Sequence, residues 1–232
     1  MNCEPDSLIV SYLCRVKKLS IQLTADGSHT LFVPEIDEHY HSVNGAIQES
    51  YHVFIKAGWQ QAPKGNVRIV EIGFGTGLNA LLTLLCADVP VEYYTVEPEP
   101  LPLDTIRLLN YAEILCPGKE ELFLALHTAA WDTPVKISSL FTLYKIRGDG
   151  NTCTLPGNAG LVYFDAFAPD KQPGMWNPAI FRRLYEAMAE GGILTTYCAK
   201  GSVRRMMQEA GYSVERIAGP PGKREMLRAT KQ

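Results

Sequence analysis

The pattern of apolar and polar positions divides this chain into two parts that meet near residue 65. In the first part, apolar and polar residues alternate over residues 20–33 around the turn Asp26-Gly27, which predicts a β-hairpin. Apolar residues then recur at helical spacing over residues 43–57, which predicts a helix. From residue 67 onward, short apolar runs alternate with helical stretches, as is typical of an α/β fold with a doubly wound parallel sheet.

The second part supplies the elements of that sheet. We expect strands at residues 67–72, 91–97, 122–126, 140–146, 161–165, 193–197, 212–217 and 225–229. We expect helices at residues 78–87, 103–114, 178–189 and 202–210. The last two strands flank Gly219-Pro-Pro-Gly222 and predict a closing antiparallel hairpin. We therefore expect a hairpin-and-helix extension at residues 1–60 and an α/β domain at residues 61–232.

Composition narrows the class of protein. The chain has 232 residues, of which 46% are hydrophobic, and a net charge of −3, which is typical of a globular protein and not of a disordered one. No apolar run approaches the ~20 residues that span a bilayer. The first ten residues lack the basic and apolar regions of a signal peptide. We therefore expect a cytoplasmic protein with no membrane partner.

Cysteine and charge placement refine this expectation. The chain has no C-x-x-C pair and no histidine at metal-finger spacing, so its cysteines predict free thiols in a reducing compartment and no metal site. Residues 200–232 hold eight basic and three acidic residues, a balance that can face a polyanion, although a solvated surface is the simpler interpretation. The six cysteines are Cys3, Cys14, Cys86, Cys116, Cys153 and Cys198.

The strongest local signal is a glycine-rich turn between a predicted strand and a predicted helix. Gly73, Gly75 and Gly77 let the loop bend tightly and let a ligand lie against backbone N–H groups. The spacing is G-x-G-x-G, which is neither the dinucleotide nor the P-loop pattern. It suits a cofactor whose amino-acid portion and ribose cross the loop, and we expect Glu71 to meet the cationic amino group of that portion. Tight strand–helix packing is the alternative explanation.

Two further acids follow predicted strands. Glu97 ends the second strand, where a carboxylate can accept both hydroxyls of a ribose; a solvated loop acid beside Glu99 is the alternative. Trp131-Asp132 follows the expected third strand at residues 122–126. There, Asp132 can bind an adenine amino group beside the Trp ring, although a helix cap explains it nearly as well.

Asp165 closes the fourth predicted strand. In an open α/β sheet, the ligand crevice lies at the carboxyl ends of the strands, so we expect Asp165 to face the reactive end of the cofactor. Phe167 and Pro169 follow it and can wall an acceptor pocket. Trp176 continues this rigid, aromatic loop, although packing beneath the loop is the more common role of a lone Trp.

A polar cluster lies between the predicted hairpin and helix. His39, Tyr40 and His41 precede Glu49 on the next helix, and we expect this segment to face the substrate or to cover the cofactor. Adjacent side chains of an extended segment point apart, so a metal site is not expected here. Surface histidines beside a half-buried tyrosine are the alternative.

Several of these segments, taken together and in this order, resemble the methyltransferase half of the MnmC-type tRNA-modification family over residues 25–232. The motifs are Asp26-Gly-Ser-His-Thr-Leu31, His39-Tyr-His-Ser42, Gly45-Ala-Ile-Gln-Glu-Ser50, Glu71-Ile-Gly-Phe-Gly-Thr-Gly-Leu-Asn-Ala80, Asp165-Ala-Phe-Ala-Pro-Asp-Lys-Gln-Pro-Gly-Met-Trp176 and Gly222-Lys-Arg-Glu-Met226. The resemblance implies a Rossmann-like class I methyltransferase sheet with a terminal antiparallel hairpin and a small N-terminal extension.

The resemblance also implies an activity. It implies S-adenosylmethionine as the cofactor and tRNA as the partner, with methylation of the aminomethyl group of 5-aminomethyl-2-thiouridine at the wobble position. By position, Glu71, Gly73, Gly75, Gly77, Asn79 and Glu97 match cofactor-binding residues. Asp165 matches the acidic residue that faces the transferred methyl group.

The chain departs from the family pattern in two places. Many members carry a fused FAD-dependent oxidase that first prepares the amine, but no G-x-G-x-x-G appears here. We therefore expect a stand-alone methyltransferase and a separate enzyme that supplies the aminomethyl substrate. Residues 140–156 look like a longer excursion before the strand at 161–165, and the sequence does not indicate its role.

The expected chemistry is direct displacement by a neutral primary amine, with Asp165 orienting the amine or relaying its proton. An unstacked base would contact the aromatic residues Tyr40, Phe167 and Trp176. Basic side chains would contact tRNA phosphates. The candidates are Lys200, Arg204, Arg205, Lys223 and Arg224. Two other functions fit the same fold: an N-methyltransferase of small molecules or proteins, and a non-catalytic nucleotide-binding domain.

Overall fold

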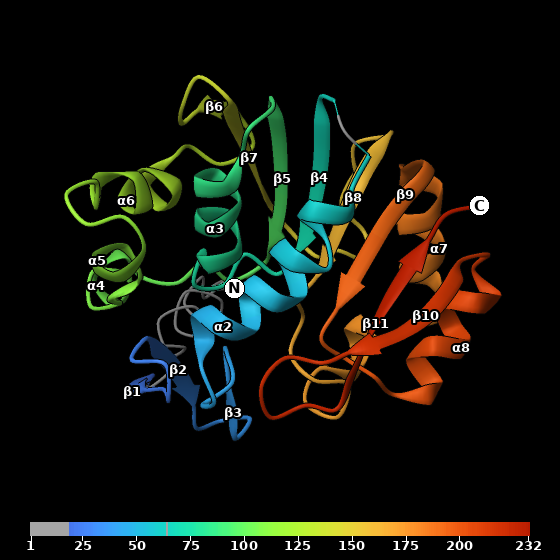
Figure 1. Ribbon diagram of the computed structural model, residues 1–232, viewed down its shortest axis with the longest axis horizontal. Coiled ribbons are helices and arrows are strands. Elements are labelled where there is room, and N and C mark those ends of the chain that lie inside the picture. The colour runs from blue at the N-terminus through green and yellow to red at the C-terminus, as the bar shows by residue number, and fades with distance from the viewer. Residues whose placement is uncertain (1–18, 64) are drawn as a thin grey trace, which may run out of the picture.

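An eight-stranded sheet forms the centre of the computed structural model, which describes residues 19–63 and 65–232. Its strand order is β10-β11-β9-β8-β4-β5-β7-β6 (Figure 1). The strands are β4 (Val67–Ile72), β5 (Val91–Glu97), β6 (Pro134–Lys136), β7 (Phe141–Arg147), β8 (Ala159–Phe164), β9 (Met188–Thr196), β10 (Ser213–Ala218) and β11 (Glu225–Thr230).

The order of pairing creates a crevice at the middle of the sheet. β4 pairs in parallel with both β5 and β8, so the chain leaves β4 in one direction for β5 and later crosses to the other side for β8. Strand order reverses at this point, and ligands of open α/β sheets bind at the carboxyl ends of the strands there. The closing hairpin of β10 and β11 is antiparallel, as the sequence predicted.

Helices cover both faces of the sheet because the strand side chains alternate. Ile69 and its neighbour Val70 are both fully buried but lie in different hydrophobic clusters, one on each face. The first face is covered by α3 (Leu78–Cys86), α4 (Leu103–Ile106), α5 (Tyr111–Leu115), α6 (Glu121–Thr128) and the π-helix η1 (Tyr51–Lys56). The second is covered by α7 (Pro178–Ala187) and α8 (Gly201–Glu209).

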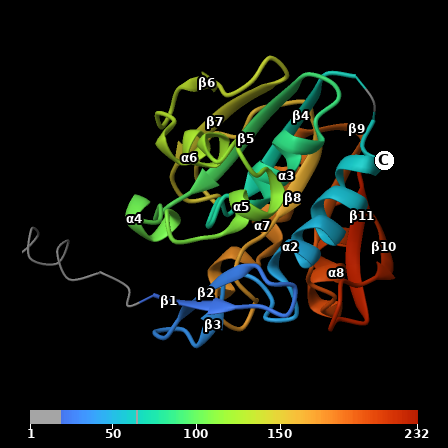
Figure 2. The same cartoon turned by 60° about the vertical axis from the view of Figure 1, so that its left-hand side comes forward.

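The N-terminal part forms a small antiparallel sheet of β1 (Ser20–Leu23), β2 (His29–Val33) and β3 (Glu38–His39). Figure 2 shows this sheet beside one end of the large sheet, with α2 (Ala46–Ser50) leading away from it. The Asp26 carboxylate joins the two, since it accepts hydrogen bonds from the backbone N–H groups of Ser28 and Gln48. α2 and η1 also pack on α3, so the boundary at residue 60 stays a prediction.

Most predicted elements are confirmed, and the errors have physical reasons. Residues 122–126 form helix α6 and not a strand; Phe123 and Leu126, three positions apart, are its buried residues. The helix expected at 103–114 is divided into α4 and α5 by Asn110, whose side chain bonds to the N-terminal hairpin. Strand β9 begins at Met188, before the glycine pair where the sequence placed its start, and β6 was not expected.

Within residues 19–63 and 65–232, no helix is long and apolar enough to cross a membrane. The same residues contain no cluster of three metal-binding side chains. Cys86, Cys116, Cys153 and Cys198 are free thiols. Cys3, Cys14 and the predicted absence of a signal peptide concern residues outside the described part of the chain.

Candidate functional site

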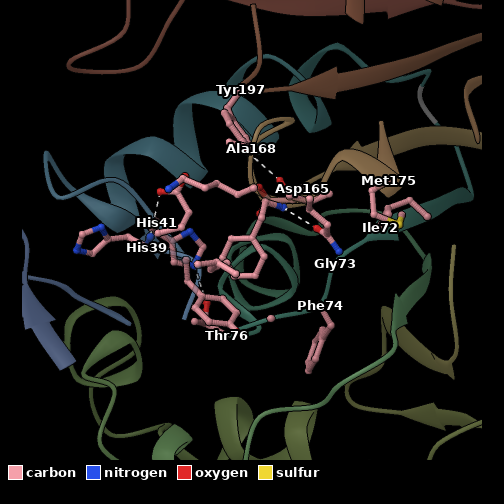
Figure 3. A pocket seen from close by; sticks show the side chains of 18 of the residues that line it. His39, His41, Ile72, Gly73, Phe74, Thr76, Asp165, Ala168, Met175 and Tyr197 are labelled. Atoms are coloured by element: carbon pink, nitrogen blue, oxygen red, sulfur yellow. Dashed lines mark hydrogen bonds between the residues drawn. The ribbon is translucent and has the colours of Figure 1, made fainter. Parts of the chain in front are cut away.

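A cavity of about 600 Å³ opens at the carboxyl ends of β4, β5 and β8. The glycine loop that follows β4 and the segment that follows β8 form adjacent parts of its wall, where Gly73 and Asp165 lie side by side (Figure 3). The N-terminal residues from Glu38 to Val43 line another side. The site therefore combines the sheet domain with the N-terminal extension.

The two central strand ends meet at Gly73. This residue has φ +95°, and a Cβ atom there would lie 2.6 Å from the carbonyl oxygen of Asp165. The sheet holds both residues in place, because Gly73 N donates to Val96 O and Asp165 N donates to Ile72 O. Only a glycine allows this approach. The structure thus brings the glycine turn and Asp165 together, as the sequence predicted.

Asp165 is half-buried and has an unusual environment. Asn79 Nδ2 donates to Asp165 Oδ2 over 2.7 Å. Burial raises the pKa of Asp165 to about 7, even though the hydrogen bond from Asn79 lowers it. The charges of Glu49 and Lys223 act in opposite directions, the carboxylate raising the pKa of Asp165 and the ammonium lowering it. The carboxyl group can therefore gain or lose a proton near neutral pH.

Glu97 is held rigidly at the end of β5. Its Oε2 accepts from Gly75 N at 3.0 Å, and its Oε1 accepts from Glu99 N at 2.9 Å. The side chain lines the cavity while its backbone partners fix its orientation. Glu97 thus lies where the sequence placed a ribose-binding carboxylate, next to the glycine loop.

Glu71 lies behind the cavity and does not line it. Its side chain is fully buried, and Thr95 Oγ1 donates to Glu71 Oε2 over 2.6 Å. Burial raises the pKa of Glu71 to about 8, so the protonated form predominates at neutral pH. The structure therefore does not support the expected direct contact between Glu71 and the cationic amino group of a ligand in the cavity. Asn79 is also buried, but it reaches the cavity through Asp165.

Gly77 faces away from the cavity, toward helix α6. It has φ +72°, and a Cβ atom there would lie 2.6 Å from His127 Nε2. Gly75, in contrast, lines the cavity, and a Cβ atom there would lie 3.1 Å from the ring of Tyr40. The three glycines consequently have different neighbours, and two of them face the cavity.

The N-terminal segment contributes aromatic and polar groups to the site. Tyr40 lies against Gly75 and makes an edge-to-face contact with Phe167, with ring centroids 4.9 Å apart. His39 and His41 also line the cavity. His39 Nε2 is hydrogen-bonded to Gln22, so its ring also belongs to the small sheet. The segment therefore covers the cavity as predicted from the sequence pattern.

An ion pair joins this segment to the closing hairpin. Lys223 Nζ lies 2.7 Å from Glu49 Oε1, and Ser42 N donates to Glu49 Oε2. The Lys223 ammonium also lies 4.1 Å from the ring centroid of Tyr197. Lys223 and Glu49 both line the cavity, so they face the site as a neutralised pair and not as separate charges.

Other predicted substrate residues lie outside the cavity. Lys200 is paired with Asp170, Arg204 is half-buried on α8, and Arg224 is exposed between β10 and β11. Pro169 does not line the cavity either. These positions are compatible with contacts to a large substrate but not with contacts to the reacting group.

Trp176 is a core residue. It is buried, its Nε1 donates to Phe167 O over 2.7 Å, and its ring packs against Phe164 with centroids 4.8 Å apart. The expectation that Trp176 contacts a substrate base is therefore not supported, and packing beneath the loop is its observed role. Through the Phe167 carbonyl it still fixes the loop that forms the cavity wall.

The structure contradicts the basis of the Asp132 prediction. The segment expected as a strand before it is helix α6, and the strand that pairs with β5 on its outer side is β7, which ends at Arg147. Asp132 is exposed, has φ +56° and accepts a hydrogen bond from Arg147 N. It does not line the cavity. The loop after β7 does line the cavity, through Gly150. Part of the excursion at residues 140–156, whose role the sequence did not indicate, therefore forms the cavity wall.

Sequence reasoning missed several residues of the cavity wall, among them Tyr197 and Gln172. Tyr197 follows β9 directly, and its hydroxyl donates to Ala166 O over 2.8 Å. The strand-end rule used for Asp165 would have found it. Gln172 lines the cavity as well, and its Oε1 accepts from Phe167 N, a contact that no sequence signal announced.

The charges of the site favour a cationic ligand. Five carboxylates line the cavity against two lysines, and one of those lysines is paired with Glu49. A cavity with this excess attracts positive groups and excludes free anions. The carboxylates are Glu38, Glu49, Glu97, Glu99 and Asp165.

The sequence is similar to those of known proteins. Residues 141–232 match a family described as S-adenosyl-L-methionine-dependent methyltransferase. The chain is 33% identical to the tRNA 5-methylaminomethyl-2-thiouridine biosynthesis bifunctional protein MnmC from Ralstonia nicotianae, over 88% of this chain and 33% of that protein. It is 32% identical to the protein of the same name from Pseudoalteromonas atlantica, over 91% of this chain and 33% of that protein. The chain thus spans about a third of the length of the curated relatives it matches.

Solved structures share the fold. MNMC2 from Aquifex aeolicus superimposes with a TM-score of 0.73 at 24% identity, over 100% of this chain and 79% of that chain. Spermidine synthase from Thermotoga maritima gives a TM-score of 0.58 at 11% identity, over 92% of this chain and 69% of that chain. The first of these matches confirms the predicted fold class, and the curated relatives confirm the predicted resemblance.

Proposed function

We propose that this chain, which resembles the methyltransferase half of the MnmC-type proteins, is an S-adenosylmethionine-dependent N-methyltransferase of tRNA. It converts 5-aminomethyl-(2-thio)uridine at the wobble position to 5-methylaminomethyl-(2-thio)uridine. The observation that carries the proposal is the meeting of Gly73 and Asp165 at the wall of one cavity. The curated relatives, whose names specify 5-methylaminomethyl-2-thiouridine biosynthesis in tRNA, support the choice of acceptor.

The residues of the cavity fit the cofactor. The backbone of the glycine loop is open to a ligand at Gly73 and Gly75, and Glu97 presents a fixed carboxylate to ribose hydroxyls. The excess of carboxylates suits a ligand that carries both an ammonium group and a sulfonium group. When bound, S-adenosylmethionine supplies an electrophilic methyl group attached to a positively charged sulfur.

Asp165 acts on the acceptor amine in this proposal. An ammonium group has no lone pair, so the acceptor must lose a proton before or during the transfer. Asn79 binds Asp165 Oδ2, which leaves Oδ1 to accept a hydrogen bond from the amine and to orient it. Because the pKa of Asp165 is raised to about 7, its carboxylate takes up a proton more readily than an ordinary aspartate does.

The covering residues hold the acceptor base and exclude water. An RNA base that leaves its stack is commonly bound by aromatic side chains, and Tyr40 and Phe167 offer such a surface at the cavity. Closing the site around the reacting groups also holds them in a reactive geometry. Outside the cavity, Arg224 is exposed and directly follows Lys223, which lines the cavity. We assign Arg224 to contact with tRNA phosphates, together with Lys200 and Arg204.

The primary amine must come from a different reaction, since methyl transfer cannot create it. A separate enzyme that supplies the aminomethyl group stays a prediction, as does a cytoplasmic location. Both concern the cell and not the cavity.

Mass spectrometry of tRNA nucleosides tests the proposal. The protein is incubated with methyl-labelled S-adenosylmethionine and tRNA that carries the aminomethyl wobble base, and the tRNA is then digested. We expect one labelled methyl group on the side-chain nitrogen of this nucleoside. Label on a free amine or a protein, with tRNA unmodified, would instead support the small-molecule or protein methyltransferase. Absence of cofactor binding would support the non-catalytic alternative.

A further inference from the structure

Two histidines from distant parts of the chain bind Thr76 in the middle of the glycine loop. His41 Nε2 lies 2.6 Å from Thr76 Oγ1, and His127 Nε2 lies 3.1 Å from the carbonyl oxygen of Thr76. His41 comes from the N-terminal extension, whereas His127 comes from α6. Figure 3 shows His41 and Thr76 at the same side of the cavity. The sequence suggested His41 as a substrate contact, but its Nε2 is used by the loop.

The position of His41 is itself fixed. Two hydrogen bonds hold its backbone against Thr30. The His41 N–H donates to Thr30 Oγ1, and the Thr30 hydroxyl donates to the His41 carbonyl oxygen. Tyr111 contacts the imidazole edge-to-face at a centroid distance of 6.2 Å. The ring therefore connects β2 of the small sheet, through Thr30, to the glycine loop.

Both imidazoles are neutral at physiological pH. Burial lowers the pKa of His41 to about 4 and that of His127 to about 3. A neutral imidazole can donate one hydrogen bond and accept another, as a hydroxyl partner requires. Thr76 is 1% exposed, so losing His41 would remove a short hydrogen bond from a buried hydroxyl.

The glycine loop needs such an external support. Gly73, Gly75 and Gly77 all have positive φ values, a state from which a free glycine-rich chain readily departs. A loop that fluctuates among several shapes binds its ligand more weakly, because only the competent fraction can bind. Thr76 is the residue between two of these glycines, where one fixed point restrains both.

We propose that His41 is a positioning residue that keeps the glycine loop in its cofactor-binding shape, so that the N-terminal extension sets cofactor affinity through the loop. This inference rests on the proposed function, because it takes the loop as the cofactor site. By thermodynamic reciprocity, a bound cofactor would in turn stabilise the extension that covers the acceptor.

The test compares two substitutions at one position, of which only the first is isosteric. Thr76→Val removes the hydroxyl and keeps the shape, whereas Thr76→Ser keeps the hydroxyl. The dissociation constant of S-adenosylmethionine is measured by calorimetry for both. We expect Thr76→Val to weaken binding about tenfold, the equivalent of one lost buried hydrogen bond, and Thr76→Ser to remain near the wild-type value.

A second set of variants identifies the partner. His41→Ala should weaken cofactor binding about as much as Thr76→Val, with no further loss in the double variant, since both remove one interaction. His41→Gln, whose amide nitrogen has a reach similar to that of Nε2, should recover part of the affinity. His29→Ala is the control, because its ring bonds to Leu108 O outside the cavity. It should bind normally and retain full activity.

The outcomes separate the two proposals. If Thr76→Val binds the cofactor like Thr76→Ser, His41 has no positioning role of this kind. If Thr76→Val fails to fold, His41→Ala and His41→Gln decide by the same measurement, and wild-type affinity in His41→Ala overturns the inference. A loss confined to the acceptor KM, with cofactor binding unchanged, would also overturn the inference and would return His41 to the substrate. A wild-type chain that binds no S-adenosylmethionine would reject the proposed function and this inference together.

Discussion

The two halves of the cavity are built in different ways. The half that we assign to the cofactor consists of Gly73, Gly75, Thr76 and Glu97, and it comes from one continuous stretch of β4, its loop, α3 and β5. The half that we assign to the acceptor gathers residues from distant parts of the chain: Tyr40, Glu49, Phe167, Tyr197 and Lys223. Glu49 and Lys223 are 174 positions apart and still form an ion pair.

The halves also differ in what fixes their geometry. Backbone N–H groups make most of the contacts that hold the cofactor half, as in those of Gly73 N with Val96 O and of Gly75 N with Glu97 Oε2, and the His41 side chain adds a support at Thr76. Side-chain contacts hold the acceptor half, such as the Glu49–Lys223 pair. The first should therefore be sensitive to any change of backbone conformation, whereas the second should respond gradually to changes of side chain. Asp165 lies where the halves meet.

The largest effect is expected at that meeting point. Asp165→Asn keeps the shape and the contact with Asn79 but cannot accept a proton, so kcat should fall about 10²- to 10⁴-fold. The variant should remain folded, as checked by circular dichroism. Full activity would remove Asp165 from the mechanism.

The dependence of kcat/KM on pH in the wild-type protein tests the role of Asp165 independently. Asp165 must be ionised to accept a proton, and its pKa in the free protein is about 7. Therefore kcat/KM should decrease as the pH falls through about 7. A profile that stays flat down to pH 5 would contradict this assignment.

A methyl group at Gly73 should break the cofactor half. Gly73→Ala forces a Cβ atom to 2.6 Å from the Asp165 carbonyl at a φ of +95°, so we expect a loss of about 2–4 kcal/mol in the free energy of unfolding and no measurable cofactor binding. Gly174→Ala is the matched control, since nothing lies within 4 Å of its added Cβ. Equal stability of the two variants in urea would show that the strand ends do not meet as described.

A change in the acceptor half should be milder and selective. Glu49→Gln leaves the Lys223 ammonium facing the cavity without its carboxylate partner, which disfavours a cationic acceptor. We expect the KM for tRNA to rise about tenfold while the dissociation constant of the cofactor stays the same. Weaker cofactor binding with an unchanged KM for tRNA would mean that the two halves have been assigned the wrong way round.

The last effect is on folding stability and concerns Glu71, the residue behind the loop. Glu71 has a pKa of about 8 when folded, against 4.5 for a free carboxyl group, so the folded state holds a proton that the unfolded state has lost between these pH values. Folding stability should consequently decrease as the pH rises from about 5 to 8. Glu71→Gln imitates the protonated form and should reduce this slope, measured by urea unfolding at several pH values. A slope identical to that of the wild type would show that Glu71 is ionised in the folded protein.

The difference between the halves also explains what the sequence could predict. The glycine loop, Glu97 and Asp165 follow buried strands directly, so local pattern was sufficient to place them in one crevice. The prediction for Asp132 used the same rule and was wrong, because the segment before it is helix α6 and not a strand.

Contacts over long separations were beyond such reasoning. The motif residues Glu49 and Lys223 were both candidates, but nothing in their separate segments indicates that they pair. Similarly, the direction of the Trp176 ring depends on Phe164 and Phe181, which lie in other elements. Tertiary packing decides whether a candidate side chain faces a ligand or the core.

A crystal structure with S-adenosylhomocysteine tests the central claim most directly. Our account predicts that the ribose hydroxyls lie on Glu97, that the backbone of Gly73 and Gly75 faces the ligand, and that its sulfur lies in the part of the cavity bordered by Asp165. A ligand bound elsewhere, or with its sulfur remote from Asp165, would contradict the claim that donor and acceptor meet at this carboxylate.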